Sequence, residues 1–195
     1  MRADYADFDF IIQPGWNNSA PDHWQSHWQQ QLGACRVDNQ EWNAPRLEDW
    51  LDGLDRAVDA CRRPVVVIAH SLGCVTVAHY AQRHPHKLAG ALLVAPADVE
   101  RASAPAALSP FSPLPQQPLP FAARIVASDS DPFCLPLRSA RIASLWRAPL
   151  TWLVGAGHIN AASGHRQWEE GLAELDALLH AVRAGQGGGA QRQQA

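Results

Sequence analysis

The sequence predicts an α/β fold in which helices cover both faces of a doubly wound, mostly parallel sheet. Short apolar runs alternate with longer stretches of helical periodicity, the pattern of parallel strands joined by crossover helices. One run, Val65–Ile68, consists only of β-branched residues, as expected for a strand buried on both faces. With 195 residues, 47% hydrophobic and 18% charged, the chain has the composition of one globular domain. We therefore expect a single domain over residues 1–184, without a separate lid domain.

The first predicted strand covers Phe8–Gln13 and ends before Pro14 and Gly15, a pair that is typical of turns. A helix follows, in which large apolar residues recur at every fourth position until Gly33 ends it. These residues are Trp24, Trp28 and Leu32. Because this spacing places them on one face of the helix, we expect them to pack in the core.

A second amphipathic helix is predicted over Leu47–Cys61, since its apolar residues form one stripe. The buried strand Val65–Ile68 comes next, and a helix-like run then continues to His84. Three further strands are predicted at Ala89–Ala95, Arg124–Ala127 and Pro149–Val154. The sheet should therefore contain about five or six parallel strands.

Two segments are predicted to lack regular structure. Residues 102–120 contain six prolines and several serines, so we expect an extended connection over the surface. Long connections of this kind often carry functional residues. Residues 185–195 are rich in Gly and Gln and are predicted to form a disordered tail without chemical function.

The composition argues against several classes of partner. A formal net charge of −3, from 16 basic and 19 acidic residues, gives no field that would attract nucleic acid or anionic lipid. Residues 1–9 include three aspartates and no long apolar run, which argues against a secretory signal or a membrane span. We therefore expect a soluble, cytoplasmic protein.

Neither the cysteines nor the histidines form a metal-binding pattern. The four cysteines, at positions 35, 61, 74 and 134, include no C-x-x-C pair, so we expect reduced and mostly buried thiols. His23 and His27 are four residues apart on a predicted helix, but the Glu of a zinc-protease H-E-x-x-H motif is missing. We expect both to be surface histidines, and we predict no metal or organic cofactor.

The most informative segment follows the buried strand directly and reads Ala69-His70-Ser71-Leu72-Gly73. The nucleophile elbow of α/β-hydrolases lies between a strand and a helix. It has a small residue two positions before the serine and a glycine two positions after it. The flanking residues must be small because another part of the backbone passes close to the turn. Ser71 is therefore the predicted nucleophile, attacking a carbonyl carbon.

A serine hydroxyl needs a base within hydrogen-bond reach, and the base needs an acid that holds one tautomer. In this fold the acid and then the histidine follow the serine in the chain. His158 lies in a glycine-rich loop after the last predicted strand and is the predicted base, with His165 as the nearest alternative. Asp131 is the predicted acid, with Asp129 and Asp98 as alternatives.

Two backbone amides are predicted to stabilise the oxyanion. The amide of Leu72 lies at the N-terminus of the helix that follows the nucleophile. The amide of Trp16 lies in the loop after the first strand, where Gly15 permits a close approach of the backbone. The Trp16 ring is expected either to wall the acyl pocket or simply to pack. His70 should point away from the nucleophile and should pack or bond locally.

At these residues the sequence resembles the small serine hydrolases grouped with retinoblastoma-binding protein 9, which include YdeN-type proteins. The residues that carry the resemblance are Pro14-Gly15 with Trp24 and Trp28, Ala69 to Gly73, Ser130 to Phe133 with Pro136, and Gly157-His158. The resemblance covers most of the chain and implies a minimal α/β-hydrolase whose triad is Ser71, Asp131 and His158. Many members have Gly where Ala69 stands, and some are glycine-rich where Trp16 and Asn17 follow the first strand.

The predicted reaction is two-step hydrolysis of an ester, or of a thioester or amide, in a small acyl substrate through an acyl-enzyme. An alternative is a protein-binding module on the same scaffold, with exposed tryptophans or the proline-rich segment as its contact surface. A nucleotide-binding, flavodoxin-like protein is disfavoured, because neither G-x-G-x-x-G nor G-x-x-x-x-G-K occurs.

Overall fold

A computed structural model of the protein describes residues 5–192, with backbone alone for residues 186–192. Its centre is a six-stranded sheet with the order β2-β1-β3-β4-β5-β6, in which every neighbouring pair is parallel. The strands are β1 (Asp9–Gln13), β2 (Cys35–Arg36), β3 (Val65–His70), β4 (Gly90–Val94), β5 (Ala122–Ser128) and β6 (Leu150–Leu153). The predicted fold class is confirmed. Only β2 was not identified, since two residues are too short to display a period.

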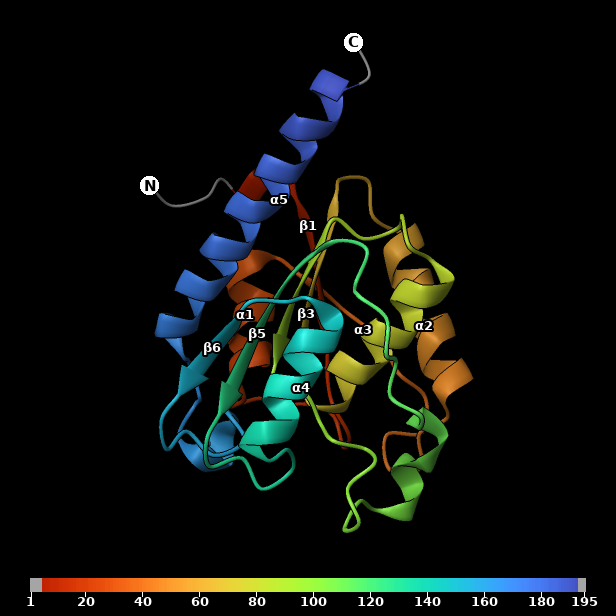
Figure 1. The fold of residues 1–195 in the computed structure, drawn as a ribbon, viewed down its shortest axis with the longest axis vertical. Helices are drawn as coiled ribbons and strands as arrows, with labels where there is room; N and C mark the ends of the chain where they lie inside the picture. Colours follow the sequence, from red (N-terminus) through yellow and green to blue (C-terminus); the bar gives the residue numbers. More distant parts are fainter. Residues whose placement is uncertain (1–4, 193–195) are drawn as a thin grey trace.

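Helices cover both faces of the sheet, which is what a doubly wound fold requires (Figure 1). They are α1 (Trp24–Leu32), α2 (Leu47–Asp59), α3 (Leu72–Arg83), α4 (Pro136–Trp146) and α5 (Leu172–Arg192). Side chains of α2, α3 and α4 belong to one hydrophobic cluster, and those of α1 and α5 belong to a second. The sheet therefore lies between two cores.

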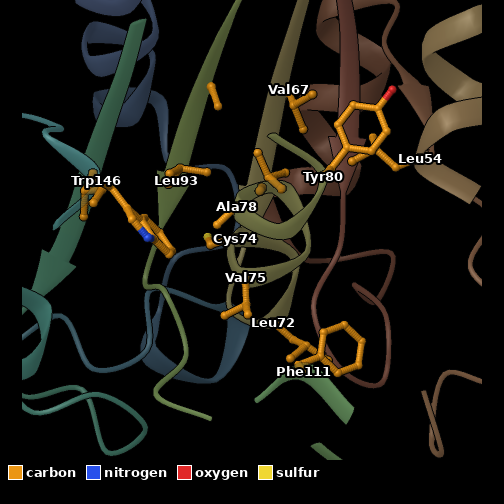
Figure 2. Packing of buried hydrophobic residues seen from close by; sticks show 14 of the residues in the cluster. Leu54, Val67, Leu72, Cys74, Val75, Ala78, Tyr80, Leu93, Phe111 and Trp146 are labelled. Atoms are coloured by element: carbon orange, nitrogen blue, oxygen red, sulfur yellow. The ribbon is translucent and has the colours of Figure 1, made fainter. Parts of the chain in front are cut away.

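The environment of strand β3 explains why its sequence does not alternate between polar and apolar residues. All six of its residues are buried. Val65, Val67 and Ala69 belong to the cluster beneath α2, α3 and α4, whereas Val66 and Ile68 belong to the cluster beneath α1 and α5. Figure 2 shows the first of these clusters, with Val67 of β3 among side chains of α3. Because both faces are apolar environments, every position favours a β-branched or small residue.

The predicted tryptophan face of α1 is in the core. Trp24 and Trp28 are fully buried, and Trp28 stacks on Trp168 with ring centroids 5.6 Å apart and planes inclined by 6°. Gly33 ends the helix with a φ of 62°, a left-handed conformation that glycine adopts at little cost. The expected packing role of the two tryptophans is confirmed.

The proline-rich segment differs from the predicted extended connection. It contains a 3-10 helix, η2 (Ala106–Phe111), whose Leu108 and Phe111 are buried. Residues three apart lie on one face of a 3-10 helix, so a single short turn is enough to bury both side chains. The prolines therefore allow a short 3-10 helix in this segment.

The C-terminal segment also differs from the prediction. The helix α5 continues to Arg192, so residues 185–192 of the predicted disordered tail are helical, and residues 193–195 lie outside the described residues. Adding a residue to an existing helix costs much less than starting a new one, which is how a helix can continue into a glycine-rich sequence.

All four cysteines are free thiols in the structure. Cys74 and Cys134 are buried, but Cys61 is half-buried and Cys35 is exposed. The expectation of mostly buried thiols thus applies to two of the four. Over residues 5–192, no helix combines the length and the apolar character that a bilayer crossing requires.

Candidate active site

Three side chains that are far apart in the sequence meet at the carboxyl edge of the sheet. Ser71 directly follows β3, Asp131 lies three residues after β5, and His158 lies in the loop after β6. The carboxyl ends of parallel strands share one edge of the sheet, which brings these loops together. The strand order reverses between β1 and β3, and ligands of open α/β sheets bind in the crevice at such a point.

The turn at Ser71 has the strained geometry of a nucleophile elbow. Ser71 has φ 55° and ψ −121°, outside the regions that residues with a side chain normally occupy. Such strain costs about 1 to 3 kcal/mol and persists only where the surroundings hold it. The Ser71 amide donates to the Val94 carbonyl of β4 at 3.0 Å, which ties the turn to the neighbouring strand. The side chain caps no amide of α3, so its hydroxyl is free for other partners.

The loop after β1 explains why small residues flank the nucleophile. A Cβ added to Gly73 would lie 2.5 Å from the Gln13 carbonyl oxygen and 2.6 Å from that of Pro14. A Cβ added to Gly15 would lie 2.8 Å from the Ser71 Cβ. All three distances are shorter than a Cβ tolerates, so the two segments can approach this closely only with glycine at positions 15 and 73. Backbone therefore packs directly on backbone beside Ser71.

The three side chains form a continuous hydrogen-bonded chain. His158 Nε2 lies 2.9 Å from Ser71 Oγ. On the other side of the ring, His158 Nδ1 lies 2.8 Å from Asp131 Oδ2 and 3.0 Å from Oδ1. A carboxylate accepts only, so Nδ1 carries the proton and Nε2 accepts from the Ser71 hydroxyl. This is the arrangement in which an imidazole can take a proton from a serine.

Of the three candidate acids, only Asp131 contacts His158. Asp131 is 4% exposed and also accepts the Phe133 amide at 2.8 Å, which orients its carboxylate. Asp129 is exposed and accepts the Gly155 amide at 2.7 Å, so it holds the loop after β6. Asp98 lies 3.2 Å from Arg138 in an ion pair. The two alternatives therefore have structural partners elsewhere.

Two other histidines near the motif have different partners. His165, the predicted rival of His158, contacts the hydroxyl of Ser163 at 3.2 Å. His70 was predicted to pack or bond locally, but its hydrogen bond is not local. Its Nε2 donates at 2.9 Å to the carbonyl of His158, 88 residues further along the chain. His70 thus holds the backbone of the segment that carries the base.

The prediction that His23 lies at the surface is wrong. His23 is 6% exposed, and its Nδ1 accepts the Gln25 amide at 3.1 Å as the N-cap of α1. Its ring packs 4.9 Å from the His70 ring, which in turn lies 4.8 Å from the His158 ring. The four-residue spacing to His27 did not reveal the N-cap role of His23, because the sequence alone does not distinguish a buried N-cap histidine from a surface one. His27 is half-buried on the outer side of the helix.

Burial keeps both of these histidines uncharged at neutral pH. Desolvation, with help from the Arg36 charge, lowers the pKa of His23 to about 4. Desolvation likewise holds the pKa of His70 well below its ordinary value, and the neighbouring histidines act in the same direction. Since Nδ1 of His23 is an acceptor, its proton resides on Nε2.

The two predicted oxyanion donors are both available. Within the described residues, neither the Leu72 amide nor the Trp16 amide has a protein acceptor. A Cβ on Gly15 would lie 3.4 Å from the Leu72 nitrogen, so the loop that carries Trp16 passes directly beside that amide. The Trp16 indole donates to the Asn43 carbonyl at 3.0 Å, which fixes the ring at the mouth of the site. Unpaired amides that converge beside a serine can stabilise a developing negative charge.

A cavity of about 260 Å³ opens over Ser71 and His158. Apolar side chains form much of its wall, and they include Trp16, Leu72, Leu108 and Phe133. Its polar lining includes Asn17, Asn18, His23, Arg101 and Asn160. Sequence reasoning assigned no role in the site to Arg101, Phe133 or Asn160, because loop residues without a motif acquire a role only when the loops meet. Within residues 5–192, no cluster of three or more His, Cys, Asp or Glu side chains is placed to hold a metal.

The comparisons with known proteins identify the family of the chain. The chain matches the model of a family described as serine hydrolase over residues 10–177. No curated protein matches the chain. Among solved structures, it is similar to a YdeN-like hydrolase from Pectobacterium atrosepticum, with 31% identity and a TM-score of 0.82 over 91% of this chain and 93% of that one.

More distant structures share the fold. The ydeN gene product of B. subtilis is 22% identical, with a TM-score of 0.72 over 89% of this chain and 99% of that one. A monoacylglycerol lipase from Paleococcus ferrophilus is 12% identical, with a TM-score of 0.66 over 93% and 96%. The family model spans most of the sheet and both loops that carry the histidine and the aspartate. This chain therefore belongs to the serine hydrolase family and is a hydrolase with the α/β-hydrolase fold.

Proposed function

We propose that the protein hydrolyses small carboxylic esters by two-step acyl transfer, with Ser71 as nucleophile, His158 as general base and acid, and Asp131 as the group that orients the imidazole. The observation that carries the proposal is the position of His158, within 3.0 Å of both the Ser71 hydroxyl and the Asp131 carboxylate. Thioesters and amides with the same acyl groups pass through the same intermediates and belong to the proposed range.

In the first step the Ser71 oxygen bonds to the substrate carbonyl carbon, and its proton moves to His158 Nε2. The carbonyl oxygen becomes an oxyanion, which the amides of Leu72 and Trp16 stabilise. One such donor contributes about 3 to 4 kcal/mol to the transition state. The bond to the leaving group then breaks as His158 returns the proton to that group, which leaves an acyl ester on Ser71.

In the second step water attacks the acyl carbon, and His158 takes the water proton. The second oxyanion collapses, the bond to Ser71 breaks, and the serine oxygen recovers its proton from His158. The carboxylic acid leaves and the enzyme is unchanged. The cavity of about 260 Å³ matches a small acyl substrate. The four free thiols fit a reducing compartment, so we place this activity in the cytoplasm.

The test is covalent labelling together with turnover. A fluorophosphonate should label the native protein at Ser71, and p-nitrophenyl esters of short acyl chains should be hydrolysed. We expect Ser71→Ala to abolish labelling and to reduce kcat about a millionfold. A panel of thioesters and anilides with the same acyl groups would rank the three bond types. An unreactive Ser71 in a folded protein would reject the mechanism and favour the protein-binding module instead.

A further inference from the structure

We propose that the ester substrate carries a free carboxylate a few bonds from the scissile carbonyl, and that Arg101 binds it. This inference rests on the proposed esterase function and adds the substrate class. The residue follows β4 in the chain, outside every motif that the sequence analysis used. It lines the cavity over Ser71, where it is half-buried.

Charge singles out Arg101 among the lining residues. Apart from the histidines, it is the one side chain of the described lining that carries a formal charge at neutral pH. Burial keeps His23 and His70 neutral, as described above. The carboxylate of Asp131 lies behind the His158 ring and is not part of the lining. The cavity therefore presents a net positive charge to its ligand.

The acidic residues near Arg101 already have other partners. Asp98 lies 3.2 Å from Arg138 Nε, close enough for an ion pair although poorly aligned for a hydrogen bond. Glu100 pairs with Arg138 Nη2 and accepts the Leu114 amide at 2.9 Å. Within residues 5–192, Arg101 has no carboxylate partner. A half-buried guanidinium without an anion is an incomplete pair, which an anionic ligand would complete.

The guanidinium is nonetheless held in place. Arg101 Nη1 donates to the Asp98 carbonyl at 2.8 Å, and its Cζ lies 5.3 Å from the centre of the Phe133 ring. Phe133 meets the His158 ring edge-on, with centroids 4.6 Å apart. Phe133 thus contacts both the cation and the His158 ring. With Nη1 engaged, the Nε and Nη2 edge remains unpaired, and this edge can bind a carboxylate through two parallel hydrogen bonds.

The shape of the site favours a carboxylate as the anion. A planar guanidinium fork matches a planar carboxylate, and a cavity of about 260 Å³ must also hold the scissile ester. Charge-assisted hydrogen bonds of this kind change affinity about 10- to 100-fold. Substrates in this class are half-esters of short dicarboxylic acids, or esters whose alcohol part carries the carboxylate.

The test compares each anionic ester with its methyl ester, which removes the charge and adds one methyl group. For the acyl side, we would use mono-p-nitrophenyl adipate and its methyl ester. For the leaving-group side, we would use 4-acetoxybenzoate and its methyl ester. In one of the two pairs, the wild type should show a higher kcat/KM for the carboxylate ester than for its methyl ester. Added salt should reduce that preference.

Three variants identify the residue responsible. Arg101→Met keeps the aliphatic stem over Phe133, and it should lower kcat/KM for the preferred carboxylate ester about 10- to 100-fold, mainly through KM. The same variant should lower kcat/KM for the matched methyl ester much less, so that the preference for the charged ester falls. Arg101→Lys should restore part of the preference, because it keeps the charge but not the fork. Arg56→Met, an exposed arginine on α2 outside the cavity, should change neither ester.

The outcomes separate this inference from the proposed function. If a fluorophosphonate labels Ser71 and methyl esters are hydrolysed, but neither pair shows a preference that depends on Arg101, the carboxylate inference is rejected alone. An equal loss with the charged and the neutral ester in Arg101→Met would also reject it, since that result indicates a structural role. If Ser71 is unreactive and no ester is hydrolysed, the proposed function fails, and the inference fails with it.

Discussion

The same parallel strands end in two very different surfaces. The amino edge of the sheet has the larger cavity, about 660 Å³ against about 260 Å³ over Ser71. Its cations are already paired, Arg63 with Asp9 at 3.1 Å and Lys87 with Asp55 at 2.8 Å. At the carboxyl edge, Arg101 has no acidic partner within the described part of the chain.

The backbone differs in the same way. Eight non-glycine residues in the described structure have a positive φ, and seven of them are in segments that follow the carboxyl ends of strands. These seven are Asn17, Asn18, Glu41, Ser71, Ala95, Ile159 and Trp168, and the eighth, Arg147, is the C-cap of α4. Strained backbone and unpaired polar groups both cost stability, so they persist where function requires them. Cavity volume alone would therefore favour the amino edge over the edge that carries the proposed site.

After Ser71→Ala, the largest expected effect comes from the buried acid at the carboxyl edge. Asp131→Asn should reduce kcat on a p-nitrophenyl ester about 10⁴-fold, because an amide in place of the carboxylate no longer fixes the productive tautomer of His158. Steady-state kinetics and urea unfolding on the same preparation separate activity from stability.

Asp129→Asn is the matched control for this variant. Asp129 lies two residues away and is exposed, and Asn keeps the oxygen that accepts the Gly155 amide. We expect kcat to stay within about twofold of wild type. Similar losses in the two variants would contradict the assignment of Asp131.

The next-largest expected effect is on the pH dependence of stability, which should differ between residues at the two edges of the sheet. The folded pKa of His23 is lowered to about 4 from 6.5, so the unfolded chain binds this proton first as the pH falls. Its contribution to stability is complete above pH 6.5 and declines towards pH 4, by about 3 kcal/mol in all. His23→Asn keeps an N-cap acceptor but cannot titrate. Urea unfolding at pH 7.5 and 4.5 should show a loss of stability about 2 to 3 kcal/mol smaller in the variant than in wild type.

Asp9, at the amino edge, should act in a different pH range. Backbone amides of Arg63 and Arg62 lower its pKa below 3.8, so its contribution is lost only as the pH falls through 3.8 and below. Asp9→Asn should therefore leave the pH dependence between 7.5 and 4.5 unchanged. An unaltered slope in His23→Asn would show that this imidazole does not titrate as proposed.

A smaller effect is expected where backbone meets backbone. In Gly73→Ala, the new methyl group would collide with the carbonyl oxygens of Gln13 and Pro14, at the end of β1. We expect a loss of about 1 to 3 kcal/mol in the free energy of unfolding, as in overpacked cores. Displacement of the Trp16 amide should also lower kcat by up to about 10² to 10³. Urea unfolding and ester kinetics measure the two effects.

Gly53→Ala provides the comparison within a helix. A Cβ at Gly53 of α2 would meet side-chain atoms of Asn39 and Val37 at 3.3 Å, and these can adjust. The gain in helix propensity, about 1 kcal/mol, offsets the crowding. We expect unchanged kinetics and near-wild-type stability. Equal damage from the two substitutions would reject the special role of the contact at Gly73.

The smallest effect should come from the paired cation at the amino edge. Arg63→Gln removes a surface ion pair and should cost less than about 1 kcal/mol in thermal unfolding. The Asp9 carboxylate keeps two backbone donors, from Arg62 at 2.7 Å and from Arg63 at 2.8 Å. Hydrolysis of both neutral and carboxylate esters should be unchanged. A selective loss of activity on carboxylate esters in Arg63→Gln would indicate that the substrate binds at the amino edge.

The sequence predicted the sheet well because its strands carry strong local signals. Val65–Ile68 has one apolar environment on each face, and the turn residues around Ser71 must be small for steric reasons. The two-residue strand β2 and the helix η2 carry no comparable signal, because neighbouring elements stabilise them.

The site could be predicted only in part. Ser71, Asp131 and His158 follow a known chain order, and the structure brings them together. The burial of His23 and the unpaired charge of Arg101 depend on which loops face one another. That information exists only after residues distant in the sequence are in contact.

The bond from His70 to the main chain of residue 158 has a mechanical consequence. This hydrogen bond engages the main-chain carbonyl and neither ring nitrogen of residue 158, so both nitrogens stay available to Ser71 and Asp131. The residue next to the proposed nucleophile therefore anchors the segment that carries the proposed base. Lengthening the turn between Leu153 and His158 should break this anchor.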